Sequence, residues 1–164
     1  MSTLYVDTIT EKTSGNGVQI AGHILQVVNT THAANVSING ATPTEYTGIT
    51  TSITPKASGS HIYCMVNVTC GNQYAGGIWY RSRLYRDTTS ALVGVENAFY
   101  MNAQYEYIGP RFLHNIIDTN DTTAGTSRTY KVYLSAESSA SGSLSINWSN
   151  SFSESSMTLM EIAQ

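Results

Sequence analysis

The chain has 164 residues, a formal net charge of −3 and a charged fraction of 12 %, which is about half that of an average soluble protein. This length suits a single domain, and the sequence has neither a long basic run nor about 20 consecutive apolar residues, which argues against nucleic-acid binding and membrane insertion. Serine, threonine, asparagine and glycine replace the missing charges, and together with eleven tyrosines they favour strands and turns over helices. The composition therefore predicts an all-β protein.

The first 21 residues differ from the rest of the chain, because the short apolar stretch "LYVDTI" is followed by the glycine-bearing connector "EKTSGNGVQIAG". We expect a leader over residues 1–21 and one domain over residues 22–164. The leader has no basic segment followed by an apolar core, so we expect no secretion signal and synthesis in a cytoplasm. The side chains expected to anchor it to a neighbouring protein, by adding a strand to that protein's sheet, are Leu4, Tyr5, Val6 and Ile9.

From residue 22 onward, short strand patterns recur every ten to fifteen residues, as expected of a sandwich or barrel. The expected strands are 23–29, 46–54, 60–70, 77–87, 91–96, 111–118, 127–136, 142–149 and 156–163. The clearest alternation is in "HIYCMVNVTC", where every second residue from Ile62 to Cys70 is apolar. Cys64 and Cys70 lie roughly 20 Å apart along this strand, too far for a disulfide, so we expect two reduced thiols in the core.

The last expected strand, within "SSMTLMEIAQ", is apolar on both faces. Met157 and Leu159 share one face with Glu161, whereas Met160 and Ile162 occupy the opposite face. A strand that is exposed to water on one side does not usually show this pattern. One face must pack on the domain core, and we expect the other face to pack against a second copy of the chain.

Several motifs resemble those of one protein family. They are "LYVDTI", "GHILQVV", "SITPKASGSHIYCMVNV" and the terminal "SSMTLMEIA". Together they resemble a family of bacteriophage fibre-type proteins, common in marine and cyanobacterial phages, whose C-terminal domain is a trimeric jelly-roll knob. The positions that match the family pattern are Ile53, Thr54, Pro55, Ile62, Met65 and 158–162. The resemblance covers nearly the whole chain.

The resemblance implies a single jelly-roll β-sandwich that forms a homotrimer. It also implies a leader that attaches to other virion proteins and a knob that lies on the virion surface. Long members of the family carry a shaft before the knob, whereas only the 21-residue leader precedes it here. Two roles remain open: a tail-fibre-type knob that binds a host-surface receptor, and a capsid decoration protein that sits as a trimer on the shell.

The sequence contains no motif typical of a hydrolase, a nucleotide-binding protein or a metalloenzyme. The four histidines, which fall in different expected strands and loops, are His23, His32, His61 and His114. No pair of carboxylates can be nominated for the cleavage of a host polysaccharide. We therefore predict a binding protein that is not an enzyme, with no catalytic residue, no metal site and no cofactor.

Aromatic side chains gather in two segments that read as connections, 71–85 and 96–112. Rigid rings beside glycine, asparagine and arginine are typical of recognition surfaces, because they provide contact area at little entropic cost. The expected ligand is a host-surface glycan or protein. The predicted receptor-binding residues are Tyr74, Trp79, Arg81, Tyr100, Tyr105, Tyr107 and Arg111. The alternative is that several rings pack in the core or between copies, with Trp79 and Phe99 the first candidates.

Overall fold

The structure, a computed structural model of the chain, describes residues 8, 10, 20–72, 78–88, 91–101, 111–120, 122–137, 143–147 and 154–164. Its elements are β1 (Ile24–His32), β2 (Val36–Asn39), β3 (Thr44–Glu45), the 3-10 helix η1 (Thr47–Ile49), β4 (Thr51–Ile53), β5 (His61–Asn72), β6 (Ile78–Arg86), β7 (Asn97–Met101), β8 (Arg111–Asp118), β9 (Arg128–Glu137), β10 (Ser143–Ile146) and β11 (Ser155–Ile162). Within the described part of the chain, no helix is long and apolar enough to cross a membrane.

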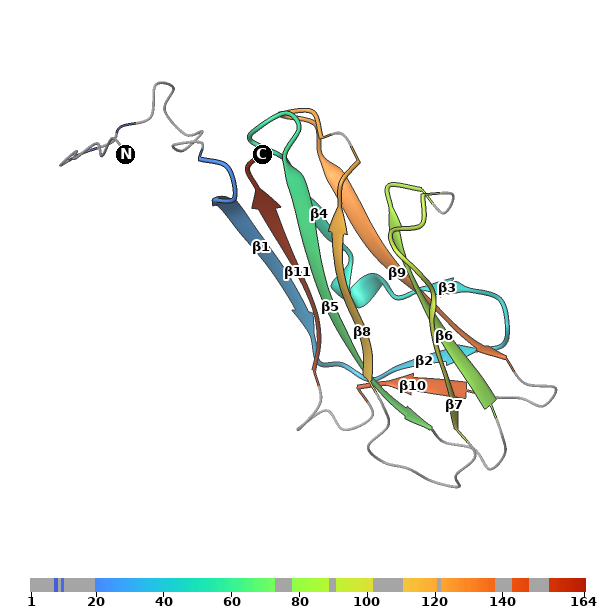
Figure 1. Cartoon of the computed structure of the whole chain (residues 1–164). Helices are drawn as coiled ribbons and strands as arrows, with labels where there is room; N and C mark the ends of the chain where they lie inside the picture. The colour runs from blue at the N-terminus through green and yellow to red at the C-terminus, as the bar shows by residue number, and fades with distance from the viewer. Residues whose placement is uncertain are drawn as a thin grey trace, which may run out of the picture.

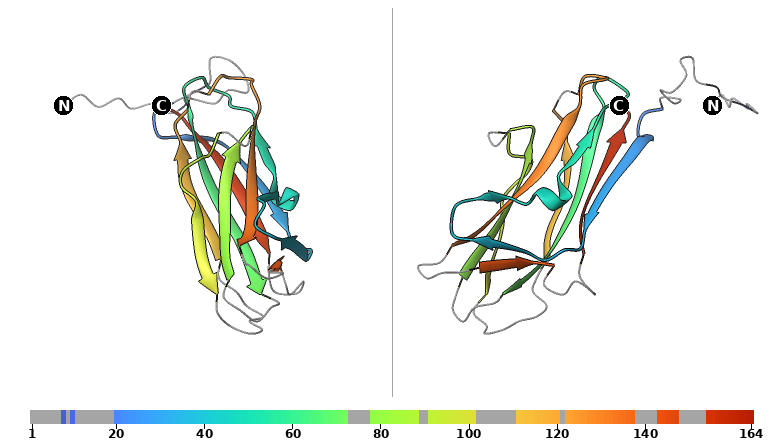
Figure 2. Two further views of the ribbon diagram at one scale, coloured as in Figure 1. Left: turned by 90° about the vertical axis from the view of Figure 1, so that its right-hand side faces the viewer. Right: turned by 180° about the vertical axis from the view of Figure 1, so that it is seen from behind.

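Two antiparallel sheets pack face to face (Figure 1). The first sheet contains β1, β11, β5 and β8 in that order, and the short pair β10 and β2 continues it from the last residues of β5. The second sheet contains β9, β6 and β7 in that order, and both β3 and β4 pair with β9. The side view in Figure 2 shows these two layers.

The strand pairing is nested, with early strands pairing with late ones. If β3 and β4 are counted as one interrupted strand and the β2–β10 pair is set aside, eight strands remain. The first pairs with the last (β1 with β11) and the second with the seventh (β3 and β4 with β9). The third pairs with the sixth (β5 with β8) and the fourth with the fifth (β6 with β7). This is one long hairpin rolled into two sheets, so the predicted jelly-roll β-sandwich is confirmed.

The core lies between the sheets and is built from side chains at alternate strand positions. Those of β5 are Ile62, Cys64, Val66 and Val68, all at most 2 % exposed. The largest buried rings are those of Tyr46, Tyr80, Phe112 and Tyr130. Full burial of a large apolar side chain contributes about 1.5–3 kcal/mol, so this alternation is the main source of the stability of the sandwich.

The two cysteines are free and buried in this core. Burial raises the pKa of both the Cys64 and the Cys70 thiol above its ordinary value, because the interior disfavours the thiolate. The expectation of two reduced core thiols is confirmed.

The expected strand 46–54 is interrupted by η1, so that two short strands, β3 and β4, fill its place beside β9. Gly48, within η1, lies against the ring of His32, and a Cβ atom at this position would come within 2.6 Å of His32 Cγ. Only glycine fits such a close approach. The break between β3 and β4 therefore depends on the contact of Gly48 with His32 of β1, which the pattern of residues 46–54 does not reveal.

The expected strand 91–96 is wrong. Leu92 makes an isolated bridge to β6, and β7 begins only at Asn97. Gly94, between them, has a φ of +76°, a left-handed conformation that ends an extended strand. A Cβ atom at this glycine would also lie 2.2 Å from Ile116 Cδ1 on β8. The strand therefore starts after the glycine, in a segment that the sequence analysis read as a connection.

Glu161 points inward from β11 and is fully buried. Its carboxylate accepts hydrogen bonds from the backbone N–H groups of Lys56 and Ala57, both at 2.9 Å, and from Ser60 Oγ at 2.8 Å and Gln26 Nε2 at 2.6 Å. Burial alone would raise the pKa of this carboxyl, but these donors outweigh it and hold the pKa below its ordinary value. The last strand thereby fixes the loop between β4 and β5.

Asn147 follows β10 and is fully buried, in a left-handed conformation with a φ of 54°. Its Nδ2 donates to the backbone oxygens of His32 at 2.6 Å and Ala34 at 3.2 Å, and to Tyr46 Oη at 3.0 Å. Its Oδ1 accepts a hydrogen bond of 2.8 Å from Ser155 Oγ. This one side chain therefore joins the turn after β1 to the start of β11.

Candidate functional site

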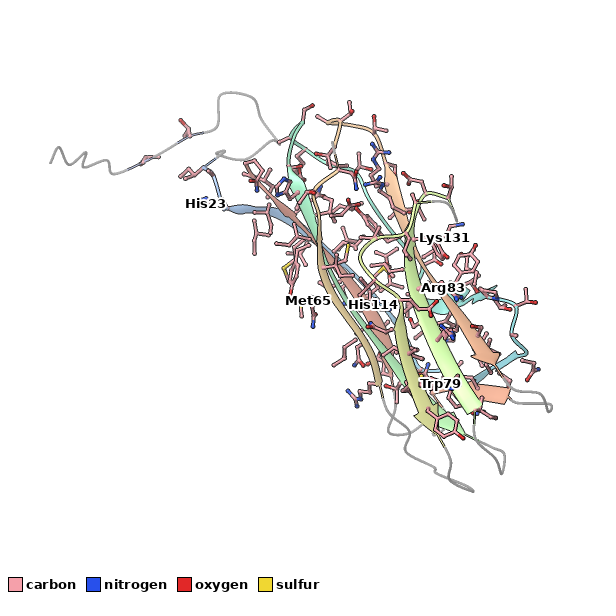
Figure 3. All side chains as sticks on the ribbon, turned by 45° about the vertical axis from the view of Figure 1, so that its right-hand side comes forward. His23, Met65, Trp79, Arg83, His114 and Lys131 are labelled. Carbon is pink, nitrogen blue, oxygen red and sulfur yellow. The ribbon has the colours of Figure 1, made fainter. Side chains whose placement is uncertain are left out.

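The core occupies the inner faces of both sheets, so a partner or ligand must use the outer faces, the edges or the loops. The two outer faces differ in chemistry. In Figure 3, Met65 points away from the sandwich on one side, whereas Arg83 and Lys131 lie on the other side, with His114 between them. The difference between the two faces decides what each can bind.

We call the outer side of β1, β11, β5 and β8 the uncharged face. Its outward side chains are Ile24, Val27, Asn29, Thr31, His61, Tyr63, Met65, Asn67, Arg111, Leu113, Asn115, Ile117, Ser156, Thr158, Met160 and Ile162. His61 and Arg111 stand at opposite ends of this face, and no described side chain between them is Asp, Glu, Lys or Arg.

Large apolar side chains on the uncharged face are open to solvent in the single chain. The exposed fractions are 56 % for Leu113, 54 % for Val27, 52 % for Ile117 and 41 % for Met65. They come from β8, β5 and β1, and the half-buried Met160 and Ile162 of β11 lie between β5 and β1. Contiguous apolar groups of this kind mark interaction surfaces. The face therefore has the composition of a contact surface.

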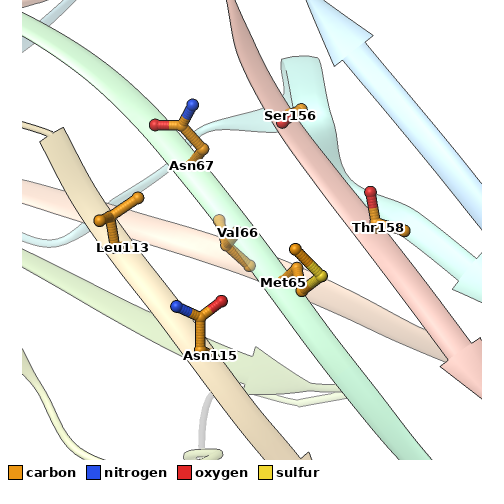
Figure 4. Close-up of a pocket in the computed structure, with 7 residues that line it drawn as sticks. All are labelled: Met65, Val66, Asn67, Leu113, Asn115, Ser156 and Thr158. Atoms are coloured by element: carbon orange, nitrogen blue, oxygen red, sulfur yellow. The ribbon is translucent and has the colours of Figure 1, made fainter.

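An open hollow of about 310 Å³ lies on the uncharged face between β11, β5 and β8 (Figure 4). Its lining residues, none of which is charged, are Met65, Val66, Asn67, Leu113, Asn115, Ser156 and Thr158. Aliphatic groups lie beside amides and hydroxyls here, so the hollow can receive an uncharged side chain and offer it hydrogen bonds. It has no ionisable group that could act on a substrate.

The terminal strand β11 contributes to the core and to the uncharged face. Met157 and Leu159 are fully buried between the sheets. Met160 and Ile162 are half-buried on the uncharged face, between β1 and β5. Met160 and Ile162, for which the sequence suggested contact with another copy, therefore lie on the uncharged face.

We call the outer side of β3, β9, β6 and β7 the charged face. Its described side chains with rings or charges are Glu45, Trp79, Arg81, Arg83, Tyr85, Glu96, Tyr100, Lys131 and Tyr133. Trp79 and Tyr100 are directly paired across β6 and β7, with ring centroids 5.3 Å apart. They are 48 % and 52 % exposed, so two adjacent aromatic rings are accessible at one end of this face.

A cluster of three charges adjoins this aromatic pair. Glu96 binds Arg81 through Oε1 and Arg83 through Oε2, so its carboxylate lies between two guanidinium groups. Arg81 follows Trp79 by two residues on the same face of β6, which places the guanidinium cluster next to the indole. Glu96 therefore holds both guanidinium groups in position beside the indole.

The other end of the charged face carries a second group of polar side chains. Tyr85 and Tyr133 meet edge to face with centroids 5.3 Å apart. Glu45 accepts hydrogen bonds from Tyr133 Oη at 3.1 Å and from Lys131 Nζ at 3.3 Å. This carboxylate and this ammonium compensate each other.

The structure brings together three of the seven predicted receptor-binding residues, Trp79, Arg81 and Tyr100, on the charged face. Arg111 lies on the outer side of the other sheet, at the end of the uncharged face. The predicted residues outside the described part of the chain are Tyr74, Tyr105 and Tyr107, together with the leader residues Leu4, Tyr5, Val6 and Ile9. Phe99 packs inward against Phe112, with centroids 4.5 Å apart, whereas Trp79 is 48 % exposed in the single chain and does not pack in the core.

The sequence analysis missed Arg83 and Glu96. The signal for Arg83 was present, because "WYRSRLY" places Trp79, Arg81, Arg83 and Tyr85 at alternate positions and therefore on one face of a strand. The sequence analysis predicted a strand over 77–87 but selected residues from the aromatic segment by residue type, without using this alternation. Glu96 had no such signal, because its approach to β6 depends on the turn at Gly94.

Ser82 and His114 form a hydrogen-bonded pair between the sheets, at 2.8 Å, with the serine 0 % and the histidine 1 % exposed. Asn97 Nδ2 donates to the Leu113 carbonyl oxygen at 2.8 Å and contacts His114 Nδ1 at 3.2 Å. Nδ1 is therefore the acceptor, and the Nε2–H group donates to Ser82. In this tautomer the ring offers no lone pair to the serine hydroxyl, so the pair joins β8 to β6 and does not activate a nucleophile.

In the described part of the chain, no group of three or more His, Cys, Asp or Glu side chains converges to hold a metal ion. No protein-family model and no curated protein matches the sequence.

Among solved structures, that of the Gx strain of infectious bursal disease virus aligns with a TM-score of 0.40 and 15 % identity, over 85 % of this chain and 37 % of the viral chain. A crystal structure of the VP2 subviral particle of infectious bursal disease virus aligns with a TM-score of 0.34 and 16 % identity, over 85 % and 38 %. The protein thus spans less than two fifths of these viral chains, and its fold assignment rests on its own strand pairing.

Proposed function

We propose that the protein is a structural component of a bacteriophage particle, a jelly-roll knob on the virion surface that assembles as a homotrimer and binds a host-surface receptor. It acts by binding, without catalysis, and its leader attaches it to other virion proteins after synthesis in the host cytoplasm. The resemblance of its motifs to phage fibre-type knobs and the jelly-roll pairing support this proposal. The observation that carries it is the uncharged face, which includes the terminal strand β11.

Self-association through the uncharged face follows from its composition. Because the face is free of charges between its ends, a second copy can be brought against it without repulsion between like charges and without burying an unpaired ion. Four strands at about 4.8 Å spacing, each about eight residues long at 3.3 Å per residue, give a face of roughly 500 Å². This is more than half of the ~800 Å² per partner of a standard interface.

The solution mass tests this assembly. A trimer of 17.8 kDa chains has a mass of about 53 kDa (three times 17.8 kDa) by light scattering after size exclusion. Leu113→Glu and Val27→Glu place a charge at exposed positions of the uncharged face, so each should yield a folded monomer. The matched controls are Leu92→Glu and Val95→Glu, at exposed positions outside this face, which should remain trimeric. A monomeric wild type, or controls as disruptive as the test variants, would remove this support.

The position on the particle is tested by copy number. A knob at the tail should be present at a few dozen copies or fewer per purified particle, by quantitative mass spectrometry. Several hundred copies would place the trimer on the capsid instead, as a decoration protein, and would contradict the receptor-binding role proposed here.

A further inference from the structure

We infer that the chains form a head-to-tail ring of three, in which the β1 side of each uncharged face packs against the β8 side of the next copy. In this ring Val27 of one copy faces Ile117 of the next copy. The adjacent pair along the strands is Asn29 and Asn115. This inference names the surfaces and the register of the contact, and it therefore rests on the proposed homotrimer.

The most exposed apolar side chains of the uncharged face lie along its two margins. These margins are β1 and β8, with β11 and β5 between them. Ile24 and Val27 of β1 are 55 % and 54 % exposed. Leu113 and Ile117 of β8 are 56 % and 52 % exposed, whereas the outward side chains of β11 are half-buried by their neighbours. The apolar surface that a partner must cover is therefore found on both sides of the face, where the two neighbours in a ring make contact.

A ring of three needs two different contact surfaces on each chain, because its interfaces are head-to-tail. The two margins differ in this way. The open hollow of about 310 Å³ is lined by residues of β11, β5 and β8, so it lies toward the β8 side of the face. Among its lining residues, Asn67 has a buried Oδ1 atom with no hydrogen-bond donor in the described part of the chain. Polar side chains on the β1 margin of the next copy can enter the hollow and offer that donor.

The charges at the ends of the uncharged face indicate the direction of the threefold axis. Arg111 stands at one end of β8, whereas no described outward side chain along the two margins between the ends is Asp, Glu, Lys or Arg. An axis that crosses the strands would press the ends of the face, and with them Arg111, against the next copy. An axis along the strands brings the uncharged margins together and leaves this guanidinium at the rim, where water can solvate it.

The strand register then determines which residues meet. Rotation about an axis along the strands keeps every residue at the same position along that axis. Residues in one row across the sheet therefore face residues of the same row in the next copy. One row consists of Val27, Met160, Tyr63 and Ile117. The adjacent row consists of Asn29, Thr158, Met65 and Asn115. The first and last residues of each row lie on the two margins, which gives the two contacts between copies.

Pairs of introduced cysteines test this register in the full-length protein. Val27 and Ile117 of one chain are three strand intervals apart, about 14 Å, which is too far for a disulfide within the chain. Oxidation of the Val27→Cys/Ile117→Cys variant with copper–phenanthroline should therefore join different copies. Non-reducing electrophoresis should show covalent dimers and trimers. Each single variant should remain uncross-linked, and the native Cys64 and Cys70, at most 2 % exposed, should not react.

The matched control is Val27→Cys/Val95→Cys, because Val95 is 71 % exposed but lies outside the uncharged face. It should give little or no cross-linked trimer. Asn29→Cys/Asn115→Cys repeats the test in the adjacent row without removing an apolar side chain, and it should also give covalent trimers. This second pair keeps the test decisive if the loss of two apolar side chains weakens assembly in the first pair.

The mass of the wild type by light scattering separates failure of this inference from failure of the proposed assembly. With a trimeric wild type, the inference is overturned if neither test pair forms cross-links between copies, or if the control pair cross-links as well as the test pairs. Cross-linking of the single Val27→Cys variant would also overturn it, because like residues would then meet across a symmetric contact. A monomeric wild type would instead refute the proposed homotrimer.

Discussion

Lowering the pH from 7 to 5 should destabilise the protein through His114, because the fold accommodates only the neutral ring. Its Nδ1 accepts a hydrogen bond from Asn97 and its Nε2–H donates to Ser82. Burial lowers the pKa of this ring from 6.5 to about 4. In the unfolded chain the ring binds a proton below about pH 6.5. Between pH 6.5 and 4 the unfolded state therefore holds one more proton than the folded state, and stability falls as the pH falls.

The size of the effect follows from the two pKa values. At about 1.4 kcal/mol per pH unit, the interval from 6.5 to about 4 corresponds to about 3 kcal/mol, of which about 2 kcal/mol is lost by pH 5. The buried carboxyls of Asp118 and Glu161 affect the stability of the fold only at lower pH. Hydrogen-bond donors outweigh burial and lower their pKa values, so their stabilisation is lost only as the pH falls below 3.8 and 4.5. The interval from pH 7 to 5 therefore reports on His114.

Urea unfolding at pH 7, 6 and 5, at one protein concentration, measures this loss. The wild type should lose about 2 kcal/mol of unfolding free energy between pH 7 and 5, and His114→Gln, whose side chain does not titrate, should lose much less. Titration of the His114 ring by NMR gives a second measurement that does not depend on the variant. A wild type whose stability is the same at pH 7 and 5, or a folded-state ring that titrates near pH 6.5, would refute the reasoning.

Three substitutions test the buried polar contacts, each by urea unfolding. Glu161→Gln places an amide among four hydrogen-bond donors and should lower the free energy of unfolding by about 3 kcal/mol. Hydrogen exchange at the Lys56 amide should become faster in this variant, and unchanged exchange would contradict the role of the carboxylate. Asn147→Asp removes the N–H donors to three acceptors and should lower the free energy of unfolding by about 2 kcal/mol. An unchanged free energy of unfolding would show that water satisfies those acceptors. Gly94→Ala should cost more than Gly59→Ala, because both glycines have positive φ but a Cβ would meet another residue only at Gly94; equal costs would exclude the clash.

The fold was predictable where one face of a strand is buried along its whole length. The expected strands 60–70, 127–136 and 156–163 lie within one residue of the N-terminal bounds of β5, β9 and β11, because strict alternation of apolar side chains is a local property. Strand β7 was missed because the break at Gly94 is caused by a φ value and by contact with β8. The pairing of β1 with β11 joins the two ends of the domain, and no local pattern encodes it.

The candidate site was predictable only in part, for the same reason. Residue type identified Trp79, Arg81 and Tyr100 as suited to recognition, and the structure places them on one face. Arg111 has the same chemistry but belongs to a strand of the other sheet, and only the topology separates it from them. The position of Glu96 between two arginines also depends on tertiary structure, because Leu92 and Val93 must first lie against Tyr85 and Leu84 of β6.

The contrast between the two outer faces connects the assembly proposal to the proposed receptor-binding role. If three copies bury their uncharged faces, each charged face points outward, and the knob presents three Trp79–Tyr100 pairs. Linked sites bind a surface that displays many receptors far more tightly than one site does, because the later contacts form at a high effective concentration. The monomer expected from Leu113→Glu should therefore bind host cells at least about tenfold more weakly than the wild-type trimer, whereas Leu92→Glu should bind like the wild type. Equal binding of the Leu113→Glu variant and the wild type to host cells would show that the sites of one trimer do not contact a common surface.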